Sequence, residues 1–124
     1  MHEARFREAE QRLWQSAGVS PTEQRLHLAR TGATVRVQET GDGPAVVFVH
    51  GVSNCGASWA PLIGRLDGFR CIVLDRPGCG LSDPLATRLA DVEQLGAFGE
   101  SLVVDVLDAM ELDRAHVVAT SFGG

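Results

Sequence analysis

The sequence predicts an α/β protein with a mostly parallel, doubly wound sheet that has an antiparallel start. Two segments in which apolar and polar residues alternate, 25–30 and 34–39, are typical of half-buried antiparallel strands. Three later segments are apolar nearly throughout, as in strands that are covered on both faces. They occupy residues 45–49, 69–75 and 115–120. Helical segments separate these three, and a strand–helix–strand order favours parallel pairing.

Two helical segments are expected between the apolar strands, at about 59–66 and 92–110. The second has an apolar face at helical spacing, which favours packing against the sheet. Its members are Leu95, Phe98, Leu102, Val103, Val106, Leu107 and Met110. These helices fill the crossovers that a parallel sheet requires.

A further helix is expected at the start of the chain, over about residues 2–17. Its apolar stripe consists of Phe6, Ala9, Leu13, Trp14 and Ala17. The run Ser20-Pro21-Thr22-Glu23 has the spacing of a capping box and predicts one more short helical turn. We therefore divide the chain into an N-terminal helical segment, 1–24, and an α/β part, 25–124.

Composition limits the classes of partner. The chain has 124 residues with a net charge of −5, and all 11 basic residues are Arg without a basic run. Nucleic acid is therefore not expected as a partner. No apolar run reaches the ~18–20 residues that span a bilayer, and the charged first residues do not form a secretory leader. We expect a cytoplasmic protein with no membrane partner.

The three cysteines do not form a C-x-x-C pair. Neither a disulfide framework nor a metal site is therefore expected, and no motif indicates a cofactor. Cys71 lies in the apolar run CIVL and is expected to be a small buried hydrophobe. Cys79 lies between two glycines and is a weak candidate nucleophile without a histidine partner.

The third apolar strand leads directly into a candidate nucleophile, Ser121. The run ATSFGG fits G-x-S-x-G with Ala119 in the first small position and Gly123 in the second. Small residues at these two positions allow a sharp strand-to-helix turn that exposes the serine hydroxyl. The alternative is an ordinary helix N-cap, a role that serine often fills. The motif alone leaves the two interpretations about equal.

The first apolar strand is followed by His50-Gly51-Val52. A glycine here lets the backbone turn off the strand end, so that the amide of Val52 is free to point into a site. With the amide of Phe122 it would form a two-donor oxyanion hole. We expect His50 to brace this loop by hydrogen bonding rather than to act as the catalytic base.

The second apolar strand is followed by the loop at 75–83, DRPGCGLSD. Gly78 and Gly80 are not a dinucleotide fingerprint, because the third glycine is missing. One interpretation of Asp75 or Asp83 is a carboxylate that orients a histidine. Hydrogen bonding within the loop is the interpretation we favour for both.

Together, VVFVHG, LDRPGCGLSD and ATSFGG resemble, in this order and spacing, the α/β-hydrolase fold superfamily and most of all its bacterial esterase and hydrolase branch. The resemblance covers residues 24–124. It implies that Ser121 is the nucleophile, that Val52 and Phe122 supply oxyanion amides, and that His50 and Gly51 shape the oxyanion loop. Serine rather than aspartate at 121 disfavours the haloalkane dehalogenase and epoxide hydrolase branches.

In this superfamily the acid and the histidine follow the serine in the chain. We therefore expect these 124 residues to be the N-terminal part of a serine hydrolase, and to be inactive alone. The complete form would hydrolyse small-molecule carboxylic esters or related acyl bonds. Alternatives are a non-catalytic remnant, or chemistry on a lactone, a carbon–carbon bond or a peroxide. If these residues are an N-terminal part, the strand at 115–120 is an open edge of the sheet, which favours self-association.

Overall fold

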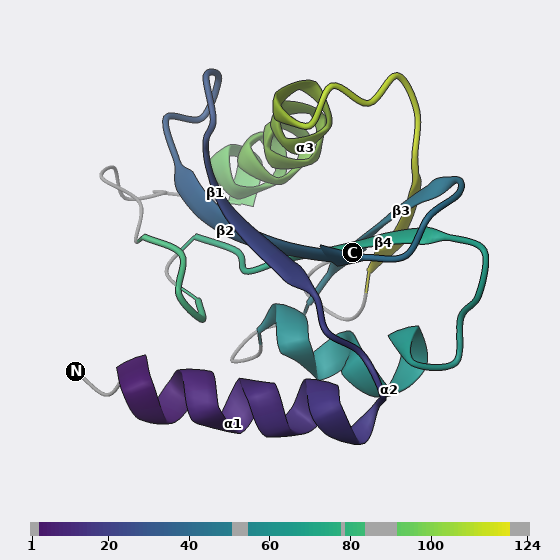
Figure 1. Cartoon of the computed structure of the whole chain (residues 1–124). Helices are drawn as coiled ribbons and strands as arrows, with labels where there is room; N and C mark the ends of the chain where they lie inside the picture. The colour runs from purple at the N-terminus through teal and green to yellow at the C-terminus, as the bar shows by residue number, and fades with distance from the viewer. Residues whose placement is uncertain (1–2, 51–54, 78, 84–91, 120–124) are drawn as a thin grey trace.

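The computed structural model describes residues 3–50, 55–77, 79–83 and 92–119, which form a five-stranded sheet between helices (Figure 1). In chain order the elements are α1 (Glu3–Ser16), β1 (Thr22–His27), β2 (Thr34–Thr40), β3 (Ala45–Val49), the 3₁₀ helix η1 (Gly56–Trp59), α2 (Ala60–Ile63), β4 (Arg70–Leu74), α3 (Val92–Ala109) and β5 (His116–Ala119).

The strands lie in the order β1-β2-β4-β3-β5. β2 pairs antiparallel with both β1 and β4, whereas β3 pairs parallel with both β4 and β5. The predicted α/β class and the antiparallel start of the sheet are therefore confirmed.

Helices cover both faces of the sheet. In Figure 1, α1 and α2 lie on one face and α3 lies on the other. The central strand β3 sends Val46 and Phe48 into the core under α1 and α2, and Val47 and Val49 into the core under α3. This two-sided burial explains why the strand is apolar throughout. None of the described helices combines the length and apolar character needed to cross a membrane.

The helical turn expected at Ser20–Glu23 is wrong, because β1 begins at Thr22. Thr22 pairs with Glu39 on β2 and Glu23 pairs with Gln38. A capping box contributes only about 1 kcal/mol. The antiparallel ladder to β2 satisfies the backbone groups of alternate residues from Thr22 onward, so pairing outweighs the local helical preference.

The expectation that β2 exposes its polar face is also wrong. Arg36 is only 1% exposed and Gln38 only 7%. Their neighbours Val35 and Val37 point to the opposite face and pack in the α3 core. The alternation of the sequence is therefore real, but helix α1 covers the polar side of this strand.

The last apolar segment was expected to be buried and is partly exposed. Val117 in β5 is 47% exposed, and β5 forms one edge of the described sheet. The opposite edge, β1, carries mostly exposed polar side chains. Charged edges resist pairing with other chains, whereas apolar edges invite it. The two edges of the described sheet therefore differ in their tendency to associate.

A buried carboxylate ties α3 to the turn between β1 and β2. Asp105, 2% exposed, accepts hydrogen bonds from the backbone N–H of Arg30 at 3.0 Å and of Thr31 at 2.8 Å, and from the Thr31 hydroxyl at 3.0 Å. Burial alone would raise the pKa of Asp105, but these donors outweigh it and hold the pKa below its usual value. The ionised carboxylate is therefore the form that stabilises the turn.

Replacing Asp105 with Asn should lower the free energy of unfolding by about 1–3 kcal/mol, because an amide is a weaker acceptor and buried donors lose their partner. The carboxylate's contribution is present above about pH 4, the pKa of aspartate in an unfolded chain, and is lost as the pH falls through the lower folded pKa. The Asn variant should lack that loss. Urea unfolding at several pH values measures both effects.

The control is Asp108→Asn on the same helix, whose pair with Arg30 at 3.1 Å is exposed on both sides. Exposed pairs contribute about 1 kcal/mol or less. If the two variants lost the same stability, the proposed role of Asp105 in holding the turn between β1 and β2 would be wrong.

Candidate active site

The register of the parallel strands brings three strand ends to one edge of the sheet. Val49 at the end of β3 lies opposite Leu74 on β4 and opposite Ala119 on β5. His50 and Asp75 follow the first two strands directly. The residue after Ala119 and the rest of the predicted elbow follow the third. In open α/β sheets this edge is where ligands bind.

The structure places some of the predicted site residues and not others. His50 and Ala119 are described, and Ala119 ends β5 as the elbow motif requires. The remaining predicted residues lie outside the described residues. They are Gly51, Val52, Ser121, Phe122 and Gly123. Their roles therefore stay predictions.

His50 joins the first strand end to the second. Its ring is 1% exposed, and its Nε2 atom accepts a hydrogen bond from the backbone N–H of Arg76 at 3.0 Å. A ring nitrogen that accepts this bond carries no proton of its own. Its lone pair is engaged and is not available to take a proton from a serine. The geometry thus fits a bracing residue; the expected role of His50 in an oxyanion loop stays a prediction.

Asp75 joins two loops at the same edge. Its side chain is buried, and its Oδ1 accepts from the backbone N–H of Gly56 at 2.7 Å while its Oδ2 accepts from that of Leu81 at 3.0 Å. Asp83, by contrast, is exposed and pairs with Arg25 at 2.6 Å. Asp75 therefore makes a hydrogen bond within the loop, as the sequence favoured, whereas the side chain of Asp83 pairs with a residue of β1 outside that loop.

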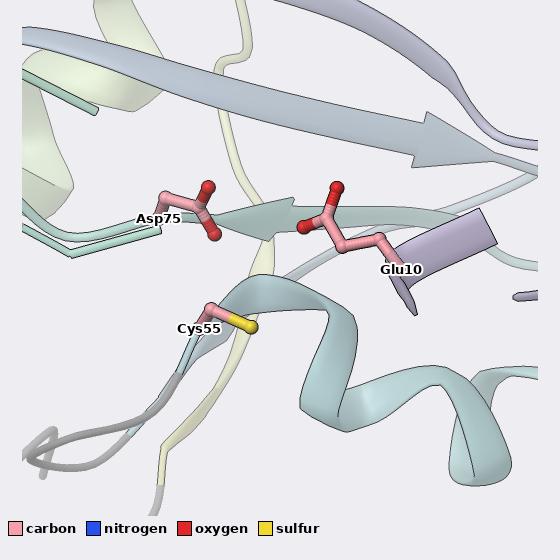
Figure 2. Close-up of side chains that lie close together, drawn as sticks. All are labelled: Glu10, Cys55 and Asp75. Carbon is pink, nitrogen blue, oxygen red and sulfur yellow. The ribbon is translucent and has the colours of Figure 1, made fainter. Parts of the chain in front are cut away.

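The Asp75 carboxylate is neutralised by Arg36 from β2. Arg36 donates to Asp75 Oδ2 from Nε at 3.0 Å and from Nη2 at 2.7 Å. On its other side the same guanidinium donates to Glu10 of α1, from Nη1 at 2.8 Å and also from Nη2. Figure 2 shows the two carboxylates pointing toward one another. Phe6 of α1 also contacts Arg36, with the guanidinium carbon 5.9 Å from the ring centre.

We call Glu10, Arg36 and Asp75 the Arg36 cluster. Burial alone would lower the pKa of Arg36, but the hydrogen bonds that it donates to Glu10 and the charges of both acids raise it above its usual value. Arg36 also reaches Glu23 at 3.2 Å. Arg7 binds Glu23 in turn and lowers the pKa of that carboxyl. Arg36, Arg7 and Glu23 are therefore charged at neutral pH.

The Arg36 cluster is buried at Asp75, and on the opposite side Arg36 contacts Glu23, which is partly open to solvent. A hollow of about 350 Å³ reaches Arg7, Glu10 and Glu23. It is also lined by Gln11, Trp14, Gln15, Val19, Ser20, Pro21 and Gln38. The Glu23 side chain is 30% exposed and that of Asp75 only 2%, so solvent screens the charge of Glu23 more.

Glu10, Cys55 and Asp75 have ligand atoms within 4.8 Å of one another, close enough to suggest a metal centre (Figure 2). Both carboxylates are occupied by the Arg36 guanidinium. Burial, together with the Asp75 charge, raises the pKa of Cys55 and disfavours the thiolate that binds metals. Glu10 and Asp75 therefore serve the Arg36 cluster, and Cys55 beside them is a poor metal ligand.

Sequence reasoning missed Glu10 and Arg36. It placed Ala9 in the buried stripe of α1, but Ala9 is exposed, whereas Glu10 is 7% exposed. Glu10 lies four residues after Phe6 and four before Trp14, so it falls within the apolar stripe. A charged residue within the apolar stripe of a helix, together with a strand in which polar and apolar residues alternate, was the signal that could have indicated a buried ion pair.

Comparison with known proteins agrees with this geometry. The sequence model of the alpha/beta hydrolase fold matches residues 44–124. The chain belongs to the alpha/beta hydrolase fold family. The match includes β3, β4 and β5 and the loops that follow them.

Named relatives of this alpha/beta hydrolase chain include two bacterial enzymes. A 2-hydroxy-6-oxo-6-phenylhexa-2,4-dienoate hydrolase of Comamonas testosteroni is 30% identical over 95 residues, which cover 73% of this chain and 32% of that protein. The 3-oxoadipate enol-lactonase 1 of Acinetobacter baylyi is 33% identical over 98 residues, covering 77% and 35%. The chain thus spans about a third of the length of the curated relatives it matches.

A solved structure shares the fold over nearly the whole chain. The carboxylesterase CesB (YbfK) from Bacillus subtilis superimposes with a TM-score of 0.79 at 23% identity. The superposition covers 98% of this chain and 41% of that one. The helix α1 and the antiparallel start are therefore part of a fold that also occurs in that carboxylesterase.

Gly80 allows the loop to pass over the Asp75 carboxylate. Its φ is +52°, and a Cβ added there would lie 2.3 Å from Asp75 Oδ2. Gly80→Ala should therefore lower the free energy of unfolding by about 1–3 kcal/mol for overpacking, in addition to the cost of a positive φ. Chemical denaturation measures the difference.

Gly32→Ala is the matched control, because Gly32 has a φ of +70° and nothing within 4 Å of an added Cβ. It should carry the cost of the backbone conformation alone. If both variants lost the same stability, the close approach of Gly80 to Asp75 would be wrong.

Proposed function

We propose that the protein containing this chain is a serine hydrolase that cleaves a carboxylic ester or a related acyl bond of a small molecule. The observation that carries the proposal is the alignment of Val49, Leu74 and Ala119 at one sheet edge. This alignment brings together the strand ends that lead into the predicted oxyanion loop and the predicted nucleophile. Membership of the alpha/beta hydrolase fold family supports the same assignment.

In the proposed reaction Ser121 attacks the substrate carbonyl, and the ester C–O bond breaks so that the alcohol leaves with a proton from the catalytic histidine. Water then hydrolyses the acyl-enzyme to the acid and frees Ser121. The backbone amides of Val52 and Phe122 stabilise the tetrahedral oxyanion, and one such donor contributes about 2.7–4 kcal/mol in the transition state. A histidine from elsewhere in the protein takes the serine proton, since Nε2 of His50 is engaged by Arg76. A downstream acid orients that histidine.

A second candidate uses the same serine on another bond. The named relatives are a hydrolase of a 2-hydroxy-6-oxo dienoate and an enol-lactonase. These names favour hydrolysis of a carbon–carbon bond beside a ketone, or of a lactone, over peroxide chemistry. Both reactions pass through an oxyanion and make the same demand on Val52 and Phe122. The expected cytoplasmic location and the absence of a nucleic-acid partner remain predictions.

The nucleophile is tested with the complete product of the gene. Ser121→Ala should abolish labelling by a fluorophosphonate probe and reduce hydrolysis of short-chain nitrophenyl esters by about 10⁴-fold or more, because the covalent step is lost. Mass spectrometry of the labelled protein should place the adduct on Ser121.

Cys79→Ala is the control and should leave labelling and turnover within about twofold of the wild type. Cys79 is half-buried in the loop after β4. Loss of labelling in the Cys79 variant, with labelling retained in the Ser121 variant, would reverse the assignment. A wild-type protein that takes up no probe would favour the non-catalytic alternative.

We also infer that the 124-residue chain self-associates through β5. Its outer edge is apolar, and Val117 is 47% exposed. Val117→Lys should shift sedimentation toward the monomer, because a charged edge disfavours strand pairing. Leu62→Lys on α2, where Leu62 is 42% exposed, is the matched control and should not. A wild-type chain that is monomeric at all concentrations would contradict this inference.

A further inference from the structure

We propose that Glu10 and Arg36 are positioning residues that act through Asp75. They hold Gly56, on the leaving side of residues 51–54, and Leu81, in the loop after β4. The inference rests on the proposed function for its catalytic consequence, since residues 51–54 include the predicted oxyanion donor Val52. Its structural part rests on described contacts alone.

Two hydrogen bonds fix the flanks. On the entering side, His50 Nε2 accepts from the Arg76 N–H at 3.0 Å. On the leaving side, the Gly56 N–H donates to Asp75 Oδ1 at 2.7 Å. The two partners, Asp75 and Arg76, are neighbours in the chain. A short stretch that follows β4 therefore sets where the segment begins and where it ends.

The leaving side depends on where the Asp75 carboxylate points. Its two oxygens serve two different chain segments, Gly56 through Oδ1 and Leu81 through Oδ2. Arg36 donates to Oδ2 from two nitrogens, Nε and Nη2, and these charge-assisted bonds hold this oxygen on the side of β2. The orientation of Asp75, and so the direction of the Gly56 bond, is set from β2.

Helix α1 controls the remaining face of Arg36. Glu10 accepts from both Nη atoms, and the guanidinium stacks near Phe6. Without the Glu10 charge, Arg36 would keep two other carboxylates, Asp75 and Glu23. Its guanidinium is then free to shift toward Glu23 and the solvent-filled hollow. That shift would remove the double contact that orients Asp75.

The first test measures amide exchange in the 124-residue chain. Glu10→Gln keeps the shape of the side chain and removes its charge. Exchange of the Gly56 and Leu81 amides should accelerate by about tenfold relative to β3 amides, which report global unfolding. Asp105→Asn is the matched control: it removes another buried carboxylate that binds backbone amides, and it should accelerate Arg30 and Thr31 instead.

The second test measures chemistry in the complete gene product. Glu10→Gln should slow fluorophosphonate labelling of Ser121 and lower kcat for nitrophenyl esters by about tenfold or more, with KM within about twofold, because a misplaced oxyanion donor weakens the transition state and not substrate binding. Asp105→Asn should leave these rates unchanged. Arg36→Lys keeps the charge but not the two-point contact, and should slow labelling as Glu10→Gln does.

The outcomes separate the inference from the proposed function. If Glu10→Gln leaves Gly56 and Leu81 exchange unchanged relative to β3, or if Arg36→Lys labels at the wild-type rate, the positioning role is wrong. If wild-type Ser121 takes up no probe, the proposed function is wrong, and amide exchange alone then decides whether Glu10 and Arg36 hold these segments. Local acceleration at Gly56 together with slower Ser121 labelling supports both.

Discussion

A single buried cation, the guanidinium of Arg36, determines how the polar face of this sheet is covered. A guanidinium out of contact with water is stable only when carboxylates surround it, and removing one partner of such a group costs about 3–5 kcal/mol. Asp75 supplies the partner from the sheet edge, and Glu10 supplies it from α1. The position of α1 follows from this requirement as much as from its apolar stripe, because Glu10 lies within that stripe.

The sequence predicted the central strands well and the antiparallel start less well. Strands β3 and β4 are apolar on both faces because both faces are buried, so pattern and environment agree. In β2 the alternation of apolar and polar residues correctly predicted a strand, but it predicted that Arg36 faces solvent, whereas Arg36 is buried. A period of two shows that the faces differ; it does not show whether another element covers the polar one. At Thr22 a local capping signal was outweighed by pairing with β2, which no short window of sequence contains.

The candidate site divides in the same way. The sequence was enough to predict that β3, β4 and β5 end at the same side of the sheet, because neighbouring parallel strands have their carboxyl ends on one side. That Arg36 and Glu10 support this edge was not, because they come from segments far away in the chain and each resembles an ordinary surface residue. Asp75 was noticed as a carboxylate in a loop. Its importance comes from two buried amides, those of Gly56 and Leu81, and depends on tertiary structure.

The N–H groups of Gly56 and Leu81 explain why charged side chains, rather than apolar ones, fill the space between α1 and this part of the sheet. An apolar cluster between α1 and the sheet would often stabilise a fold as well as a buried ion pair does. It would leave the N–H groups of Gly56 and Leu81 without acceptors, at a cost of about 1–3 kcal/mol each. A carboxylate accepts from both and fixes their directions, which no apolar side chain can do. Once Asp75 is present, its charge requires Arg36, and the remaining buried N–H donors of Arg36 require an acceptor, which Glu10 supplies. The chain of contacts from α1 to the strand ends thus follows, step by step, from the need to hold two loop amides in place.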